Sequence, residues 1–346
     1  MPWPEPAIAL EFACGAILLL GVILYAVFGG ADFGGGVWDL LARGPRADEQ
    51  RRVIAHAIGP IWEANHVWLI FVIVLVFTIF PPVFAALSIA LYIPLSLALL
   101  GIVFRGAAFI FRTPARGVAY GAGAWDRVFA IASTVTPIFF GMAAGAVASG
   151  QIRSIDGAVT SDLWRTWLAP FPLIIGLLAL TTCAYLAAVY LTVETTGDLQ
   201  EDFRRRALGA GAIFALLAAI ALPFARSEAP WIWHGLTSRA AIVVVPIGVG
   251  LALLSGWAVY TRRYLLARMA AVAEVAVLLV GWALAQYPYL VVPDLTFENA
   301  AASPAMMRAA LIVFGLGALF LVPSLWFLFT VFKADLPGVT EVEPTE

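Results

Sequence analysis

Long apolar runs are the feature of this sequence that most restricts its fold. A helix needs about 20 residues to cross the hydrocarbon core of a bilayer. Of the 346 residues, 62% are hydrophobic and 12% charged, with a mean hydropathy of +0.95. Since a soluble domain is about half apolar and about a quarter charged, the expected solvent is a bilayer. The nine apolar runs are residues 8–28, 60–80, 83–104, 124–148, 169–192, 207–225, 239–260, 269–287 and 306–332.

These runs predict an all-α integral membrane protein with about nine transmembrane helices in one membrane domain, residues 1–346. Lipid offers no water to an open sheet edge, and no run alternates as the strands of a membrane barrel do. Pro81 and Pro82 separate the second and third runs, which predicts a tight helical hairpin. No Lys or Arg precedes the first run, so we expect a retained helix rather than a cleaved signal.

Basic residues predict the orientation of the chain in the membrane. About three quarters of the 20 Lys and Arg residues fall between the runs on one side. This bias predicts an external N-terminus and a cytoplasmic C-terminus in the cytoplasmic (inner) cell membrane. The net charge of −2 gives no support to a nucleic-acid partner.

Ionisable residues gather at the predicted cytoplasmic ends of the first four runs. Asp32 follows the first run, and Glu63 and His66 begin the second. Arg105 follows the third run, and Asp126 begins the fourth. Such residues in membrane proteins usually face a bundle interior and often mark proton routes. Two interpretations stay open at this point: a proton route, or ion pairs that only hold four helix ends together.

Other chemistry has weaker support. The E-x-x-H pattern of Glu63 and His66 occurs once, whereas a di-iron bundle needs it twice with further glutamates. Haem ligation by His56 or His66 is conceivable from residue type alone. The two cysteines are expected to be small buried apolar residues. Glu274 is a further carboxyl inside the eighth run, and the sequence names no partner for it.

The segment FGGADFGGGVW predicts a flexible turn with close helix contacts, because its glycines match no phosphate-binding pattern. Gly30 with Gly34, and Gly141 with Gly145, have the spacing of closely packed membrane helices. A secondary transporter with a cytoplasmic-side proton or ion site is the second functional interpretation. The expected polar cluster lies at one surface, however, whereas transporter sites are usually near the midplane.

Several motifs together resemble subunit II of cytochrome bd-type quinol oxidases, including the cyanide-insensitive branch. The family pattern is G-F-D-x-G, then W-D-x-N-x-V-W-L, then F-R, then W-D before an apolar helix. The corresponding segments occur in the same order through most of the chain: ADFGGGVWDLLAR, IGPIWEANHVWLI, FRGAAFIFR, WDRVFAIASTVTPIFFGMAAGAVASG and YPYLVVPDLTFENAAASPAMMRAAL.

The resemblance implies two four-helix bundles plus one peripheral helix. It also implies a partner, subunit I, that carries haem b and haem d, or b-type haem only, and that oxidises quinol and reduces oxygen. This chain would be the non-haem scaffold of the heterodimer and would contribute to cytoplasmic proton uptake. A small accessory subunit and a structural quinone also occur in the family.

Residue by residue, the resemblance assigns the proton pathway to Asp32, Glu63, Arg105 and Asp126, with His66 beside them. Glu63 stands where an aspartate is usual in the family, and it keeps the acid with one more methylene. His66 replaces the usual glutamine or glutamate. Gly29 stands where many members have a further aspartate, so a relay that uses that residue must be rerouted here.

Overall fold

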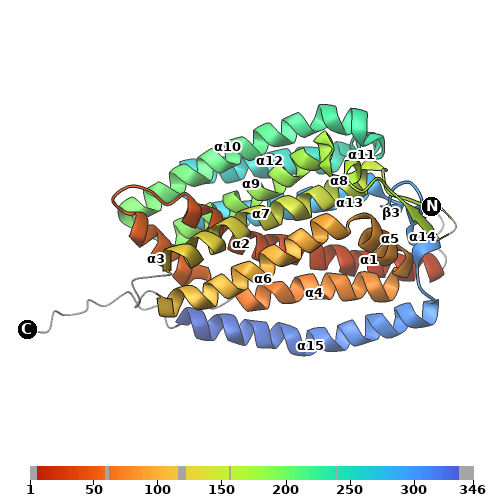
Figure 1. Cartoon of the computed structure of the whole chain (residues 1–346), viewed down its shortest axis with the longest axis horizontal. Helices are drawn as coiled ribbons and strands as arrows, with labels where there is room; N and C mark the ends of the chain where they lie inside the picture. Colours follow the sequence, from red (N-terminus) through yellow and green to blue (C-terminus); the bar gives the residue numbers. More distant parts are fainter. Residues whose placement is uncertain (1–5, 59–61, 116–121, 156, 239–240, 335–346) are drawn as a thin grey trace, which may run out of the picture.

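The long helices lie side by side along the longest axis of the molecule (Figure 1). The computed structural model describes residues 6–58, 62–115, 122–155, 157–238 and 241–334. Within these ranges, eight helices are long and apolar enough to cross a bilayer, and a bent helix pair makes up to nine. This confirms the all-α membrane fold and the expected number of spans.

The first span is longer than the predicted run 8–28. It consists of α1 (Pro6–Leu24), a π-helical turn η1 (Tyr25–Gly29) and α2 (Gly30–Leu40). The flexible turn expected at the glycines is therefore wrong, because the chain stays helical. A Cβ on Gly34 would overlap the carbonyl group of Cys183, so glycine lets two helix backbones meet. Cys183, like Cys14, is a buried free thiol.

The second and third runs divide differently from the prediction. Helix α4 (Trp62–Ile79) ends before Phe80, whose backbone is not helical and which precedes Pro81. The chain then bends by 118° into the short helix α5 (Pro81–Ala90), and α6 (Tyr92–Ala115) follows a second break at Leu91. The prolines do cause a sharp turn, but the run 83–104 is two helices.

The remaining long helices complete two four-helix bundles. The first bundle contains the first span, α4, α6 and α7. The second bundle contains α9, α10, α12 and α13, and α15 lies outside both against α1 and α4. The bundles join where α9 packs on α2 and α7, and Gly141 and Gly145 of α7 meet α9 there. The bounds are α7 (Ala122–Ser149), α9 (Pro170–Glu194), α10 (Gly197–Glu228), α12 (Ala241–Tyr260), α13 (Tyr264–Gln286) and α15 (Pro304–Ala334).

Short elements cover the end of the molecule where α1 begins (Figure 1). Arg153 joins two of them through hydrogen bonds from Nε and Nη2 to the carboxylate of Asp294, at 2.8 and 3.0 Å. These elements are β1 (Arg153–Ile155), β2 (Ala158–Thr160), α8 (Arg165–Leu168), α11 (Pro230–Leu236), β3 (Tyr289–Val291), β4 (Leu295–Thr296) and α14 (Phe297–Ala300), with β1–β2 and β3–β4 paired antiparallel.

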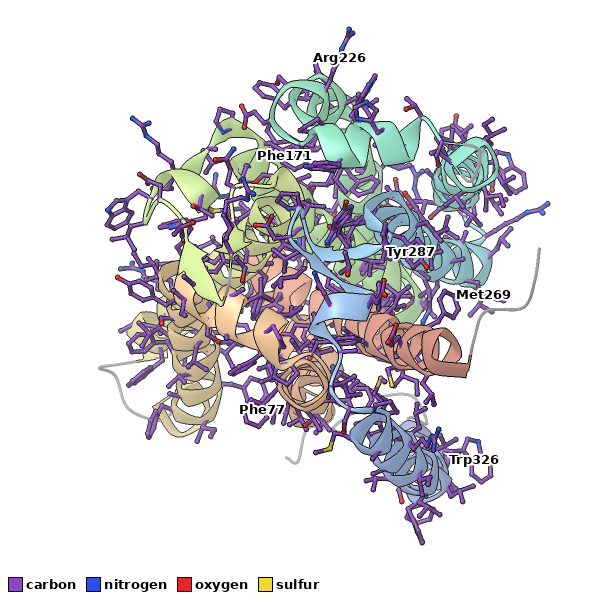
Figure 2. All side chains as sticks on the ribbon, turned by 90° about the vertical axis from the view of Figure 1, so that its right-hand side faces the viewer. Phe77, Phe171, Arg226, Met269, Tyr287 and Trp326 are labelled. Carbon is purple, nitrogen blue, oxygen red and sulfur yellow. The ribbon has the colours of Figure 1, made fainter. Side chains whose placement is uncertain are left out.

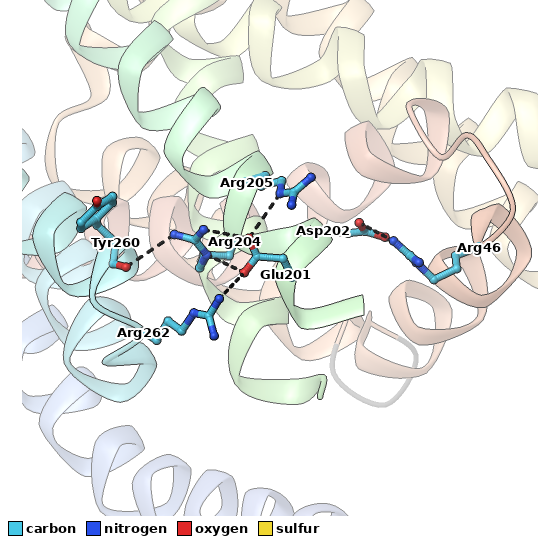
Figure 3. A network of polar contacts seen from close by, with 7 residues as sticks. All are labelled: Arg46, Glu201, Asp202, Arg204, Arg205, Tyr260 and Arg262. Atoms are coloured by element: carbon cyan, nitrogen blue, oxygen red, sulfur yellow. Dashed lines mark hydrogen bonds and ion pairs between the residues drawn. The ribbon is translucent and has the colours of Figure 1, made fainter. Parts of the chain in front are cut away.

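Charged residues join the helices at the opposite end, where α3 (Ala47–Ile58) lies. Arg46 binds Asp202 of α10 through two hydrogen bonds of 2.8 and 2.9 Å. Glu201 accepts hydrogen bonds from Arg204, Arg205 and Arg262 (Figure 3). These pairs tie α3 and the α12–α13 connection to the start of α10.

The outside of the bundles is apolar. Figure 2 shows Phe77, Met269 and Trp326 pointing outward around the perimeter, and all three are exposed. An apolar surface on this scale suits contact with lipid or with another membrane protein.

Candidate functional site

A buried carboxyl group lies in the interior of the first bundle. Asp32, on α2, is 6% exposed. The side-chain amide of Asn65, on α4, donates a hydrogen bond of 2.6 Å to Oδ2 of Asp32. The same Nδ2 lies 3.5 Å from the carbonyl oxygen of Phe28. Asn65 thereby fixes the carboxyl group against the turn of helix that precedes it.

A buried guanidinium lies beside this carboxyl. Arg105 of α6 is 1% exposed, and its Nε donates to Oγ of Ser133 on α7 at 3.1 Å. The guanidinium carbon lies 5.1 Å from the ring centroid of Phe33 and 5.3 Å from that of Phe129. Cation–π contacts of this kind stabilise a desolvated cation. Asp32 and Arg105 are within electrostatic range of each other, but in the described part of the chain they form no direct ion pair.

Aromatic and imidazole rings complete the cluster. His66 is partly buried, and its ring centroid lies 6.3 Å from that of Tyr25 and 6.0 Å from that of Phe33. The Tyr25 hydroxyl and Nη2 of Arg105 are buried, and neither has a hydrogen-bond partner among the described residues. Buried polar atoms without a partner are rare in folded proteins and are frequent at functional sites.

The structure brings three of the five predicted site residues together: Asp32, His66 and Arg105. Asp32 and Arg105 lie farther from their helix ends than expected, about 12 Å from Leu40 and about 15 Å from Ala115. The expectation that these two sit at helix ends is wrong, because both helices continue past them. His66 lies in the second turn of α4, as predicted.

The other two residues lie elsewhere. Asp126 is partly buried near the start of α7, about 10 Å along the helix from Ser133. Glu63 belongs to α4 by its backbone, but its side chain lies outside the part of the chain that the structure describes.

The sequence did not identify Tyr25 or Ser133. Both lie in apolar runs. Only the rotation of their helices determines that Ser133 faces Arg105 and that Tyr25 faces His66. A π-helical turn such as η1 has no simple sequence signal, although such turns are frequent at functional sites.

A haem group does not fit this cluster. An axial histidine needs an open ring nitrogen facing a large pocket, whereas the His66 ring packs against Tyr25 and Phe33. His56 and His234 are exposed. Within the described ranges, no group of three or more His, Cys, Asp or Glu residues could hold a metal ion. The chemistry available is that of acid, base and hydrogen-bonding groups shielded from water.

Comparison with known proteins assigns the family. The model described as cytochrome bd terminal oxidase subunit II matches residues 10–332. The putative cytochrome bd menaquinol oxidase subunit II of Bacillus subtilis (strain 168) is 24% identical, over 96% of this chain and 100% of that protein. Cytochrome bd-I ubiquinol oxidase subunit 2 of Escherichia coli (strain K12) is 30% identical, over 63% of this chain and 56% of that protein.

A solved structure agrees with these relatives. The structure of bd oxidase from Geobacillus thermodenitrificans matches with a TM-score of 0.79 at 22% identity, over 94% of this chain and 99% of that chain. At this identity the match shows a shared fold. The family model shows more, since it covers most of the sequence: the chain belongs to the cytochrome bd terminal oxidase subunit II family, as one membrane-spanning subunit of an oxidoreductase complex.

Proposed function

We propose that this chain is the non-haem subunit of a quinol:oxygen oxidoreductase, in which subunit I holds the haems. The names of the two relatives, a menaquinol and a ubiquinol oxidase subunit, support quinol as the electron donor. The packing of His66 against two rings supports placing the haem ligands in the partner. The bound haem would supply electron transfer and oxygen chemistry there, and this chain would supply a scaffold and a proton.

The second part of the proposal is that Asp32 carries protons toward the partner from the end that bears α3. The observation behind it is a carboxyl group inside a membrane helix, 6% exposed and without a direct cationic partner among the described residues. Such a group is costly in a bilayer, and ionisable residues inside membrane helices are therefore rare and usually functional. The excess of basic residues at the α3 end supports placing that end in the cytoplasm.

Each neighbour has a role in this mechanism. Asn65 donates to Oδ2 of Asp32 and so leaves Oδ1 to accept a proton. The positive charge of Arg105 favours the ionised carboxylate, so a proton that binds Asp32 can leave again. Arg105 does so without a direct ion pair to the carboxylate oxygens. We propose Glu63 and Asp126 as the groups between this carboxyl and the cytoplasm, with His66 beside Asp32 in the same route.

The test is Asp32→Asn in the assembled oxidase, with haem content and quinol:oxygen turnover measured together. Loss of a positioned acid–base group costs about 10²–10⁴ in rate, so we expect turnover to fall at least tenfold with normal haem content. Glu201→Gln, outside the site, is the control and should keep its turnover. Normal turnover in Asp32→Asn would contradict the proton role, and lost haem or assembly would assign Asp32 to the scaffold.

A secondary transporter is not favoured, because the oxidase family model spans residues 10–332. An absorption spectrum of the native complex purified through this chain separates the two functions. Haem bands in stoichiometric amount are expected for the oxidase, and a haem-free complex would contradict it.

A further inference from the structure

A second buried carboxyl group lies in the other bundle. Glu274, on α13, is 5% exposed. Its Oε2 is buried and has no hydrogen-bond partner among the residues that the structure describes. The cluster at Asp32 does not include this residue, and the mechanism above does not use it. Ionisable groups at this depth are rare in membrane helices and usually functional.

Two hydroxyl groups from neighbouring helices lie on the same side of α13. Tyr185 of α9 and Ser255 of α12 are hydrogen-bonded to each other through their side-chain oxygens. Oγ of Ser255 is also 3.4 Å from the carbonyl oxygen of Ala267, on α13. Tyr185 is within electrostatic range of Glu274. Three helices of the second bundle therefore each contribute one polar side chain to its interior.

These groups lie at increasing depth from one end of the molecule. Ser255 is about 8 Å along α12 from Tyr260, and Tyr185 about 14 Å along α9 from Glu194. Glu274 is about 15 Å along α13 from Tyr264. All three helix ends belong to the end that carries the Glu201 network (Figure 3). Ser255 thus lies between Glu274 and the aqueous phase at that end, and Tyr185 lies at about the same depth as Glu274.

The charges nearby favour a proton over a salt bridge. Arg268, one to two turns from Glu274 on α13, pairs with Glu194 at 3.6 Å and stacks on Tyr190 at 4.7 Å. Tyr185, on the packed helix α9, is a titratable group within electrostatic range of Glu274.

The donor set also argues against a metal ion. Divalent cations prefer several oxygen ligands with more than one carboxylate, and this interior offers one carboxyl and two hydroxyls. A proton needs a single carboxylate oxygen and hydroxyl groups that can pass it on.

We propose that Glu274 is a second proton-binding site of this subunit, and that it exchanges its proton with the aqueous phase through Tyr185 and Ser255. The proton adds to a carboxylate oxygen and gives the neutral acid. Each hydroxyl passes one proton on and receives one, so both are neutral after the transfer. This site is separate from Asp32 and does not depend on the function proposed for it.

The test is infrared spectroscopy of the complete oxidase complex in H₂O and D₂O over the neutral pH range. A protonated carboxyl group has a carbonyl band that is distinct from the bands of a carboxylate. We expect such a band to shift in D₂O, to disappear in Glu274→Gln and to remain in Glu298→Gln, which changes an exposed glutamate. Tyr185→Phe keeps the ring and removes the hydroxyl, so it should change the band position and slow the D₂O exchange.

Two results would overturn the proposal. One is a carbonyl region that Glu274→Gln leaves unchanged at every pH, since the carboxyl would then never hold a proton. The other is a Glu274 band that does not shift in D₂O, since the group would then be sealed from the aqueous phase. If Glu274→Gln does not assemble, Tyr185→Phe decides alone: an unchanged band and exchange rate contradict the route, and a changed one supports it.

Discussion

Charged side chains in the interior of the first bundle and at the end of the second are arranged in opposite ways. At the start of α10, Glu201 accepts hydrogen bonds of 2.7 Å from both Nε and Nη2 of Arg204, and water reaches the group. In the first bundle, Asp32 and Arg105 are buried, and their hydrogen bonds go to the neutral Asn65 and Ser133. Complete ion pairs at the end join helices, whereas separated charges inside remain available to a proton.

The largest effect is expected from removing the buried cation. Arg105→Met keeps an unbranched side chain without the guanidinium and leaves Asp32 without its positive neighbour. Removing one partner of a direct buried charge pair costs about 3–5 kcal/mol, which is an upper bound for these separated charges; the thermal transition of the purified complex should fall and turnover should be lost.

The double variant Asp32→Asn with Arg105→Met sharpens this test. Removing both charges should restore part of the stability that Arg105→Met loses, because no uncompensated charge is left. If the stability losses of the two single variants simply add in the double variant, Asp32 and Arg105 are not coupled. The interior charges would then not differ from the surface ion pairs in the way described above.

A smaller effect is expected where helix packing holds the interior charges in place. Gly34→Ala puts a methyl group into the carbonyl of Cys183, and overpacking of this kind costs about 1–3 kcal/mol. Gly30→Ala is the matched control one turn earlier, where the nearest atom is 3.5 Å from an added Cβ. Gly34→Ala should lower the thermal unfolding temperature of the complex, and Gly30→Ala should not. Equal effects of the two variants would contradict the packing argument.

A pH effect is expected at the opposite end of the molecule, at Asp294. Hydrogen bonds from Arg153 hold the pKa of the Asp294 carboxyl below its usual range. A lowered pKa contributes stability that is present above the ordinary value of about 4 and is lost as the pH falls through the lower folded value. Asp294→Asn should therefore cost about 0.2–1 kcal/mol at neutral pH.

In acid, this difference between wild type and Asp294→Asn should disappear. Unfolding followed across the pH series checks it. A difference that grows as the pH falls would have the wrong sign for a lowered pKa.

The smallest effect is expected at the exposed network itself. Glu201→Gln weakens three ion pairs at the surface, where solvent and salt screen such pairs. Turnover should stay unchanged, and the small loss of stability should vanish in high salt. A large loss of turnover would place this end of α10 in the proton route and remove the distinction between the two regions.

The sequence was informative about the spans because lipid enforces a simple rule of length and polarity. Nine apolar runs and the meeting of Asp32 with Arg105 followed from that rule. The distances of Asp32 and Arg105 from their helix ends did not follow, because the glycines that predicted a turn are part of a helix. The sequence also did not show that the non-helical residues Phe80 and Leu91 bound a separate short helix. Tyr25 and the surroundings of Glu274 were missed because only helix rotation decides what an apolar-run residue faces.

The π-helical turn at Tyr25–Gly29 has a consequence for the angular phase of the first span. Each residue of an α-helix advances the side chains by about 100°, and a π-helical turn accommodates one extra residue. Without that accommodation, every side chain after Gly29 would rotate by that angle, and Asp32 would leave the interior for a neighbouring face. The five-residue turn thus sets the rotation of α2 relative to α1. Helix α1 can keep its own contacts while Asp32 on α2 faces Asn65.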